Sequence, residues 1–231
     1  MSIVDHLKSA LPKYKTKIPS SGKETFFRPF LVREEKILLL AQEDGDESTI
    51  VNAIATIVEN CVEDIDNAKK IPMYDLEYLF CQIRAKSVSE TAEPTFVCPD
   101  TEETVKIGIK LTDLKIETGE RESDVKLNET VKIRLKDPVV TDYINMDKEN
   151  ATDSLISKCF DTITVGDEVF SGRDLTDVEK QEIIQNLTHK QYEEVYSFIA
   201  NQPKLYHVAK YRTKDGVERE LRLEGIGDFF G

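Results

Sequence analysis

The sequence predicts an α+β protein, with helices and antiparallel strands in separate stretches of the chain. Apolar residues recur at helical spacing over 31–94 and again over 138–203, so both regions are expected to be helical. Over 95–137 apolar and polar residues alternate instead, which indicates a small antiparallel β-sheet with one face in water. The final stretch, 204–231, combines a predicted β-hairpin with a hydrophobic tail. Such segregation is typical of α+β folds and differs from the regular alternation of βαβ units.

Residues 1–30 are expected to form an extended amino-terminal arm. Pro12, Pro19 and Gly22 interrupt any helix in this stretch. Residues 24–28, Glu-Thr-Phe-Phe-Arg, read as a short strand. Pro29 ends that strand because proline lacks the amide hydrogen that a sheet requires.

Three helices are expected in the region 31–94. The first begins near Val32 and ends at the polar turn 44–46, and the second covers about 47–63. Pro72 opens the third, because the first turn of a helix does not need the amide hydrogen that proline lacks. Their apolar faces are formed by Ile37, Leu38, Leu40 and Ala41, by Ile50, Ile54, Ile57, Val58 and Cys61, and by Leu76, Leu79, Phe80 and Ile83.

The strands of the middle sheet are expected near Phe96, over 105–111, around Leu114 and over 131–135. Each run alternates apolar and polar side chains over a few residues. The sheet is therefore predicted to bury one face only.

The second helical region contains a helix start with a specific signal. Thr176 and Glu179 have the spacing of a capping box, in which each side chain accepts a backbone hydrogen bond from the other residue. Helices are also expected over 139–146, 151–162 and about 189–201, with a brief strand or turn over 164–170. Beyond this region, Asp215-Gly216 is a hairpin-turn signal between two strand-like runs.

Composition limits the classes of function. The chain has 231 residues, with 44 acidic and 31 basic side chains and a net charge of −13. A protein that binds a phosphate backbone needs a basic face, so direct binding of nucleic acid is not expected. No apolar run approaches the roughly 20 residues that cross a bilayer, and residues 1–17 lack a signal-peptide pattern. We therefore expect a soluble protein that is made in a cytoplasm and does not insert into membranes.

Patterns typical of catalysis do not occur in the sequence. The histidines, His6, His189 and His207, fall in unrelated segments, and neither an HExxH nor a G-x-S-x-G motif is present. The turn at 44–48 resembles the start of a calcium loop, but Thr49 stands where that loop requires glycine. We therefore expect no catalytic residues and no cofactor.

The four cysteines, Cys61, Cys81, Cys98 and Cys159, are widely spaced and are expected to be free thiols. Cys98-Pro99 resembles the first half of a zinc knuckle. The second ligand should follow within two or three residues, where Asp100 and Thr101 stand instead. No metal site is therefore expected.

Several blocks of the sequence resemble the T-even-type bacteriophage baseplate hub protein family. The first block contains residues 19–23, Pro-Ser-Ser-Gly-Lys, followed by 27–30, Phe-Arg-Pro-Phe, and 34–36, Glu-Glu-Lys. The second block spans 75–88 and includes Ile-Arg-Ala-Lys-Ser-Val. The ending, with Asp228-Phe229-Phe230, is also similar to that family. The resemblance runs from about residue 15 to the end of the sequence.

This resemblance implies a non-enzymatic structural or assembly protein of a contractile phage tail. Such a protein binds other baseplate or hub proteins in a multi-subunit assembly, is synthesised in the host cytoplasm and lies in the tail baseplate of the virion. An alternative is a transient assembly chaperone for the hub or tape-measure protein that is absent from the mature virion. A phage-encoded enzyme is the least favoured class. Family members often carry a second cysteine where Thr101 stands here, so Cys98 is at most the remnant of a family zinc site.

The matched blocks supply candidate interface residues. Phe27, Arg28 and Phe30 combine aromatic rings with arginine, the composition of binding hot spots. The alternative is that the phenylalanines pin the arm to the protein's own helices. Arg84 and Lys86 end a helix, where cations offset the helix dipole, and this position also suits contact with an acidic neighbour.

Phe229 and Phe230 form an apolar tip beyond Gly225 and Gly227, which allow the chain to turn. Two exposed phenylalanines are unfavourable in water, since each offers roughly 2–3 kcal/mol on full burial. A pocket for them is expected either on this protein or on a neighbour, and we favour the neighbour.

Overall fold

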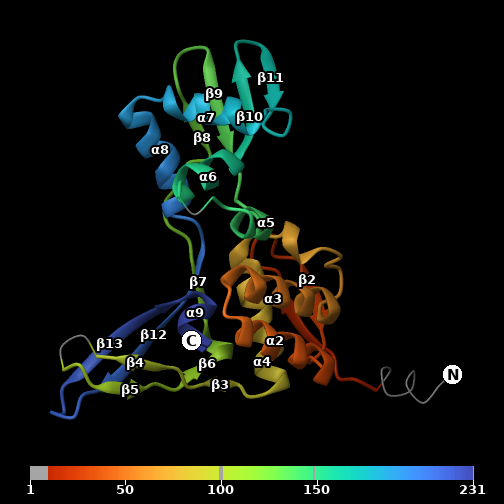
Figure 1. The fold of residues 1–231 in the computed structure, drawn as a ribbon, viewed down its shortest axis with the longest axis vertical. Helices are drawn as coiled ribbons and strands as arrows, with labels where there is room; N and C mark the ends of the chain where they lie inside the picture. Colours follow the sequence, from red (N-terminus) through yellow and green to blue (C-terminus); the bar gives the residue numbers. More distant parts are fainter. Residues whose placement is uncertain (1–9, 99–100, 148, 231) are drawn as a thin grey trace. The chain divides into compact units, whose positions relative to one another are not determined.

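The computed structural model describes residues 10–98, 101–147 and 149–230. Two compact units make up the chain, and they divide it unevenly (Figure 1). The first unit combines Met1–Glu117 with Lys204–Gly231, and the second is the continuous segment Thr118–Pro203. The fold is α+β, as predicted, with helices and several small antiparallel sheets.

The first unit begins with a β-hairpin. Strands β1 (Tyr14–Lys17) and β2 (Glu24–Phe27) pair antiparallel, and β2 covers most of the predicted strand. The turn closes through a hydrogen bond from the Ile18 amide to the Lys23 carbonyl oxygen at 2.9 Å, with Gly22 at φ 66°. The prediction of an extended arm is therefore wrong for these residues. The Pro-Ser-Ser-Gly stretch reverses the chain, so the two strands satisfy each other's backbone groups.

Three helices follow the hairpin, as the apolar spacing predicted. They are α2 (Val32–Asp44), α3 (Glu47–Cys61) and α4 (Met73–Ser87), with a short 3-10 turn at Ala68–Lys70. Gly45 ends α2 in a left-handed conformation, and the Asp46 side chain caps α3 by accepting from the Thr49 amide at 3.0 Å. Pro72 precedes α4 as its N-cap.

The strands after α4 do not form the single middle sheet that was expected. The short strands β3 (Thr91–Ala92) and β6 (Ile109–Lys110) pair with each other, and so do β4 (Thr95–Val97) and β5 (Thr104–Lys106). The predicted run 105–111 is interrupted at residues 107–108, and a 3-10 turn follows at Leu111–Asp113.

Distant strands complete the first unit. The hairpin of β12 (Lys204–Arg212) and β13 (Glu218–Glu224) forms as predicted, and β7 (Lys115–Glu117) joins it along β12. The chain then ends in the short helix α9 (Gly225–Phe230). A core that includes Cys81, Ile109, Leu111, Leu205 and Phe229 fills the space between α4, the hairpin and α9.

The second unit is a four-stranded antiparallel sheet with helices packed on it. The sheet order is β11 (Glu168–Ser171), β10 (Phe160–Val165), β9 (Val131–Leu135) and β8 (Asp124–Lys126). The helices are α5 (Val140–Ile144), α6 (Ala151–Lys158), α7 (Asp177–Gln185) and α8 (His189–Ala200). Thr176 and Glu179 form the predicted capping box of α7.

One sequence expectation fails in this unit and another is met. The predicted helix 151–162 stops at Lys158, because Phe160 enters the sheet. The strand or turn expected over 164–170 is present as part of a β-hairpin, in which β10 and β11 pair. Strands expected in one middle sheet therefore divide between the two units, with β7 in the first and β9 in the second, where β9 pairs with the unpredicted strand β8.

Candidate protein-interaction groove

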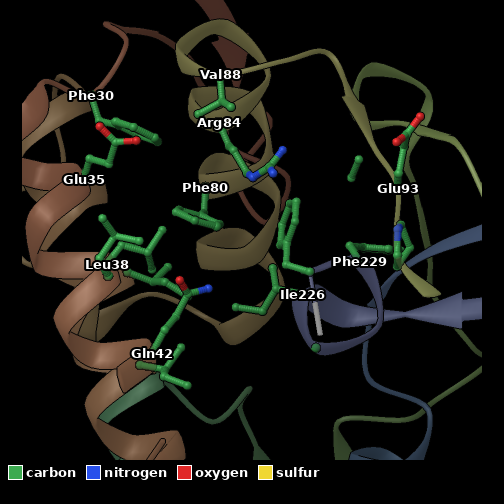
Figure 2. Close-up of a pocket in the computed structure, with 17 residues that line it drawn as sticks. Phe30, Glu35, Leu38, Gln42, Phe80, Arg84, Val88, Glu93, Ile226 and Phe229 are labelled. Carbon is green, nitrogen blue, oxygen red and sulfur yellow. The ribbon is translucent and has the colours of Figure 1, made fainter. Parts of the chain in front are cut away.

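A groove with a volume of about 580 Å³ lies in the first unit between α2, α4 and α9 (Figure 2). That volume falls in the range of roughly 300–1,000 Å³ that ligand-binding clefts occupy. Side chains from α2 and α3 form one wall, and side chains from α4, residues 92–94 and α9 form the other. The apolar lining includes Phe30, Leu38, Leu39, Phe80, Ile226 and Phe230.

The α2 wall is fixed by the junction between the first hairpin and the helix. The buried Glu34 carboxylate accepts hydrogen bonds from Arg28 Nη2 at 3.1 Å and from Arg33 Nε at 2.7 Å, and from the Leu31 amide at 2.7 Å. Burial alone would raise the pKa of Glu34, but these hydrogen bonds outweigh it and hold the pKa below its ordinary value. The helix therefore starts at a buried ion pair.

The same junction corrects two of the predicted interface residues. Phe27 is 3 % exposed, and its ring packs against Tyr14 with a centroid distance of 5.6 Å. The Arg28 side chain is 17 % exposed and is committed to Glu34 and to the Pro29 carbonyl oxygen. The Phe27 ring thus packs within the hairpin, and Arg28 joins the hairpin to the start of α2, so intramolecular partners already cover both side chains.

The α9 wall is fixed by the carboxy-terminal phenylalanines. Phe229 is 1 % exposed and belongs to the core of the first unit. Phe230 is partly buried and meets Phe80 edge to face, with ring centroids 5.8 Å apart. The expectation that this tip docks on a neighbour is therefore wrong for Phe229, because the chain turns into a helix at Gly225 and places the ring in its own core.

A carboxyl group from α4 meets the start of α9. Glu77 Oε1 accepts a hydrogen bond from the Ile226 amide at 3.3 Å. Burial raises the pKa of Glu77 to about 7, and the hydrogen bond offsets only part of that effect. Glu77 thus titrates close to neutral pH while it holds the helix that forms one wall of the groove.

Arg84 of α4 lies beside Phe230. Its guanidinium carbon is 4.4 Å from the centre of the Phe230 ring, a cation–π contact. Among the described residues its Nη1 atom is buried without a hydrogen-bond partner. Burial lowers the pKa of Arg84 below its ordinary value. A charged donor that lacks an acceptor is costly, since even a neutral buried group without a partner costs roughly 1–3 kcal/mol.

The remaining predicted residues have different environments. Phe30 lines the groove, and its backbone amide donates to the Ser87 hydroxyl at 2.9 Å. Lys86 pairs with Glu90 and lies over the Tyr14 ring at 5.4 Å. The structure therefore brings Phe30, Arg84, Phe229 and Phe230 together at the groove and leaves Phe27, Arg28 and Lys86 outside its lining.

The apolar face predicted for α2 is only partly covered. Leu39, which lines the groove, is 52 % exposed, and Val32, Ile37 and Leu40 are exposed as well. Three consecutive leucines span more than half of a helical turn, so they cannot all face one core. The leucine run 38–40 therefore signals a second apolar surface, and the single face predicted for this helix did not include Leu39.

Cys98 lies in the same unit but away from the groove lining. It is buried, and its sulfur accepts a hydrogen bond from the Tyr211 hydroxyl at 3.2 Å. Within residues 10–98, 101–147 and 149–230, no three His, Cys, Asp or Glu side chains gather in a way that could hold a metal ion. The same described ranges contain no helix that is long and apolar enough to cross a membrane.

An apolar groove beside an incompletely covered helix is typical of a protein that binds other proteins. A family model described as T4 bacteriophage base plate protein matches residues 11–231. The chain therefore belongs to this family of phage baseplate proteins. No curated protein and no solved structure matches the chain.

Proposed function

We propose that this baseplate protein acts at the hub of a contractile phage tail, where it is a structural component that binds other baseplate proteins. The observation that carries the proposal is the groove between α2, α4 and α9, together with the exposed leucines of α2. A helix that leaves several large apolar side chains in water is stabilised when a partner covers them. Membership of the baseplate family supports other baseplate proteins as those partners.

The groove supports a role in binding other proteins that requires no catalysed reaction. Its walls carry mostly carbon atoms, with a few polar groups that can orient a bound segment. Interfaces use this composition, in which apolar contacts supply affinity and a few polar groups supply register. We propose accordingly that the protein works by holding other proteins in place and not as an enzyme.

The test compares two surface substitutions in the phage. Leu39→Asp places a charge on the exposed α2 face, whereas Val178→Asp makes the same kind of change on α7 of the second unit. Leu39 is 52 % exposed and Val178 is 68 % exposed, so both variants should fold. Circular dichroism of the purified variants checks this.

Mass spectrometry of purified particles and of baseplate intermediates then gives the answer. We expect the wild-type chain in particles at a fixed ratio to other baseplate proteins. The Leu39→Asp chain should be missing from the assemblies and Val178→Asp should be incorporated normally. If the wild-type chain occurs only in intermediates, the protein is an assembly chaperone. If the Leu39→Asp chain is incorporated normally, the groove is not the binding surface.

A further inference from the structure

The unsatisfied guanidinium of Arg84 restricts what the groove can bind. Arginine keeps its proton at every physiological pH, so burial cannot relieve the cost by neutralising the group. The aromatic ring of Phe230 covers one side of it at 4.4 Å, and among the described residues Nη1 has no acceptor. A planar donor of this kind is best satisfied by a carboxylate, which can accept two parallel hydrogen bonds.

Two carboxylates of the first unit, Glu93 and Glu34, are engaged elsewhere. Glu93 lines the groove, but its Oε2 atom lies 2.5 Å from Lys106 Nζ. Glu34 of α2 is already bound by Arg28 and Arg33. Figure 2 shows Arg84 extending from α4 toward the side of the groove on which Glu93 lies. Leu38 and Gln42 lie on the α2 side of the groove. Among the described residues no carboxylate, Glu35 of the groove lining included, accepts from Arg84 Nη1, so the acceptor is best supplied by whatever fills the groove.

The rest of the lining determines the remainder of the ligand. Leu38, Leu39, Phe80 and Ile226 offer apolar walls, which favour large apolar side chains. Glu35 and Glu93 also line the groove and would repel a ligand with many negative charges, such as a nucleic acid. A ligand with a single carboxylate among apolar side chains suits the apolar walls and avoids this repulsion.

We infer that the groove binds a segment of another baseplate protein in which one aspartate or glutamate side chain, flanked by large apolar side chains, pairs with Arg84. This inference rests on the proposed binding function and adds the chemistry of the partner. Arg84 lines the groove, where the incoming carboxylate supplies the acceptor that Nη1 lacks. The apolar side chains of the segment cover the exposed leucines of α2.

The experiment uses the full-length chain and overlapping synthetic peptides that cover the other baseplate proteins of the phage. Peptides that bind the wild-type chain are resynthesised with each acidic residue replaced by its amide, and affinities are measured by fluorescence anisotropy. The protein variants are Arg84→Met, which keeps an unbranched apolar stem, and Arg134→Met, which removes an exposed arginine of the second unit as the matched control.

We expect one acidic residue of the bound peptide to be critical. Its amide form should bind the wild-type chain about tenfold more weakly or worse, because the amide has no negative charge and only one acceptor oxygen for the guanidinium. The same replacement should matter little to Arg84→Met, which binds both forms weakly, and Arg134→Met should behave as wild type. Leu39→Asp should abolish binding of both forms.

Several outcomes would overturn the inference. One is that the acid-to-amide change has equal effects on the wild-type chain and on Arg84→Met. Others are that the bound peptides contain no critical acidic residue, or that only peptides with a free terminal carboxylate bind. If peptides fail to bind in the groove while Leu39→Asp is still excluded from particles, the proposed function stands and only the inference about the segment fails.

Discussion

Two arginines of the first unit, Arg28 before α2 and Arg84 on α4, differ in how their guanidinium groups are satisfied. At the start of α2, Arg28 has two acceptors, the Glu34 carboxylate and the Pro29 carbonyl oxygen. At the α9 contact, Arg84 lies on the Phe230 ring, and Nη1 has no acceptor among the described residues. The first arginine is hydrogen-bonded within the fold, whereas the second keeps a buried donor atom without an acceptor. The contrast separates a cation whose acceptors lie within the fold from one whose acceptor, as we propose, comes from a partner.

Arg28→Met should give the largest loss of stability. The substitution leaves the buried Glu34 carboxylate with Arg33 as its remaining side-chain cation, and breaking a buried ion pair costs roughly 3–5 kcal/mol. We expect about 3 kcal/mol, since Arg33 still donates to Glu34. Thermal unfolding followed by circular dichroism measures the change. A variant that melts like the wild type would show that Arg28 does not hold the hairpin to α2.

Arg84→Met should change stability in the opposite direction. It removes a buried donor without an acceptor, which costs roughly 1–3 kcal/mol, and gives up a cation–π contact worth about 0.5–1 kcal/mol. The net expectation is a gain of about 1 kcal/mol in the free energy of unfolding. A melting temperature that falls by as much as that of Arg28→Met would mean that Arg84 is structural, and the contrast between the two arginines would disappear.

The two glycines of α9 offer a matched comparison within one helix. Gly225 has φ 68°, and an added Cβ would lie 2.8 Å from Glu77 Oε1, whereas a Cβ on Gly227 would meet open space. Gly225→Ala should therefore cost about 1–2 kcal/mol. Gly227→Ala should be neutral or stabilise by up to about 1 kcal/mol, because alanine favours the helix. Calorimetry of both variants checks the order, and equal effects would contradict this geometry of α9.

Glu77 should show its effect as a dependence of stability on pH. Its folded-state pKa of about 7 lies above the ordinary value of 4.5, so the folded protein holds a proton that the unfolded chain releases between these values. The stabilisation by the protonated form is complete below pH 4.5 and is lost as the pH rises through about 7. Hydrogen exchange of the α9 amides should therefore be slower near pH 5 than near pH 8 after correction for intrinsic rates.

Glu77→Gln provides the control for this measurement. Glutamine keeps an oxygen that can accept the Ile226 amide hydrogen bond but cannot ionise. The variant should lose the corrected difference between the two pH values. If that difference persists, another group is responsible for it.

Local patterns predicted the helices and the hairpin well, because those elements depend on near neighbours in the sequence. The capping box at Thr176, the N-cap at Pro72 and the turn at Asp215-Gly216 all fall where their residue types require. The pairing of strands was harder to predict from the sequence. Whether β7 pairs with β9 or with β12 depends on long-range packing, and the period-two pattern is the same in either case.

The residues of the candidate site could be predicted only in part, and the reason is related. The sequence pointed to Phe30, Arg84, Phe229 and Phe230, and all four line the groove. It could not separate them from Phe27 and Arg28, because the same residue types serve in cores and at interfaces. Only the folded neighbours, Glu34 for Arg28 and the Phe230 ring for Arg84, distinguish the two uses.

The discontinuous first unit has a consequence during translation. The second unit, Thr118–Pro203, is continuous and can fold as soon as it leaves the ribosome, whereas β12, β13 and α9 emerge only afterwards. The wall of the groove that contains Phe230 is thus among the last parts of the unit to be synthesised. A nascent or prematurely terminated chain that lacks these elements therefore has no finished groove.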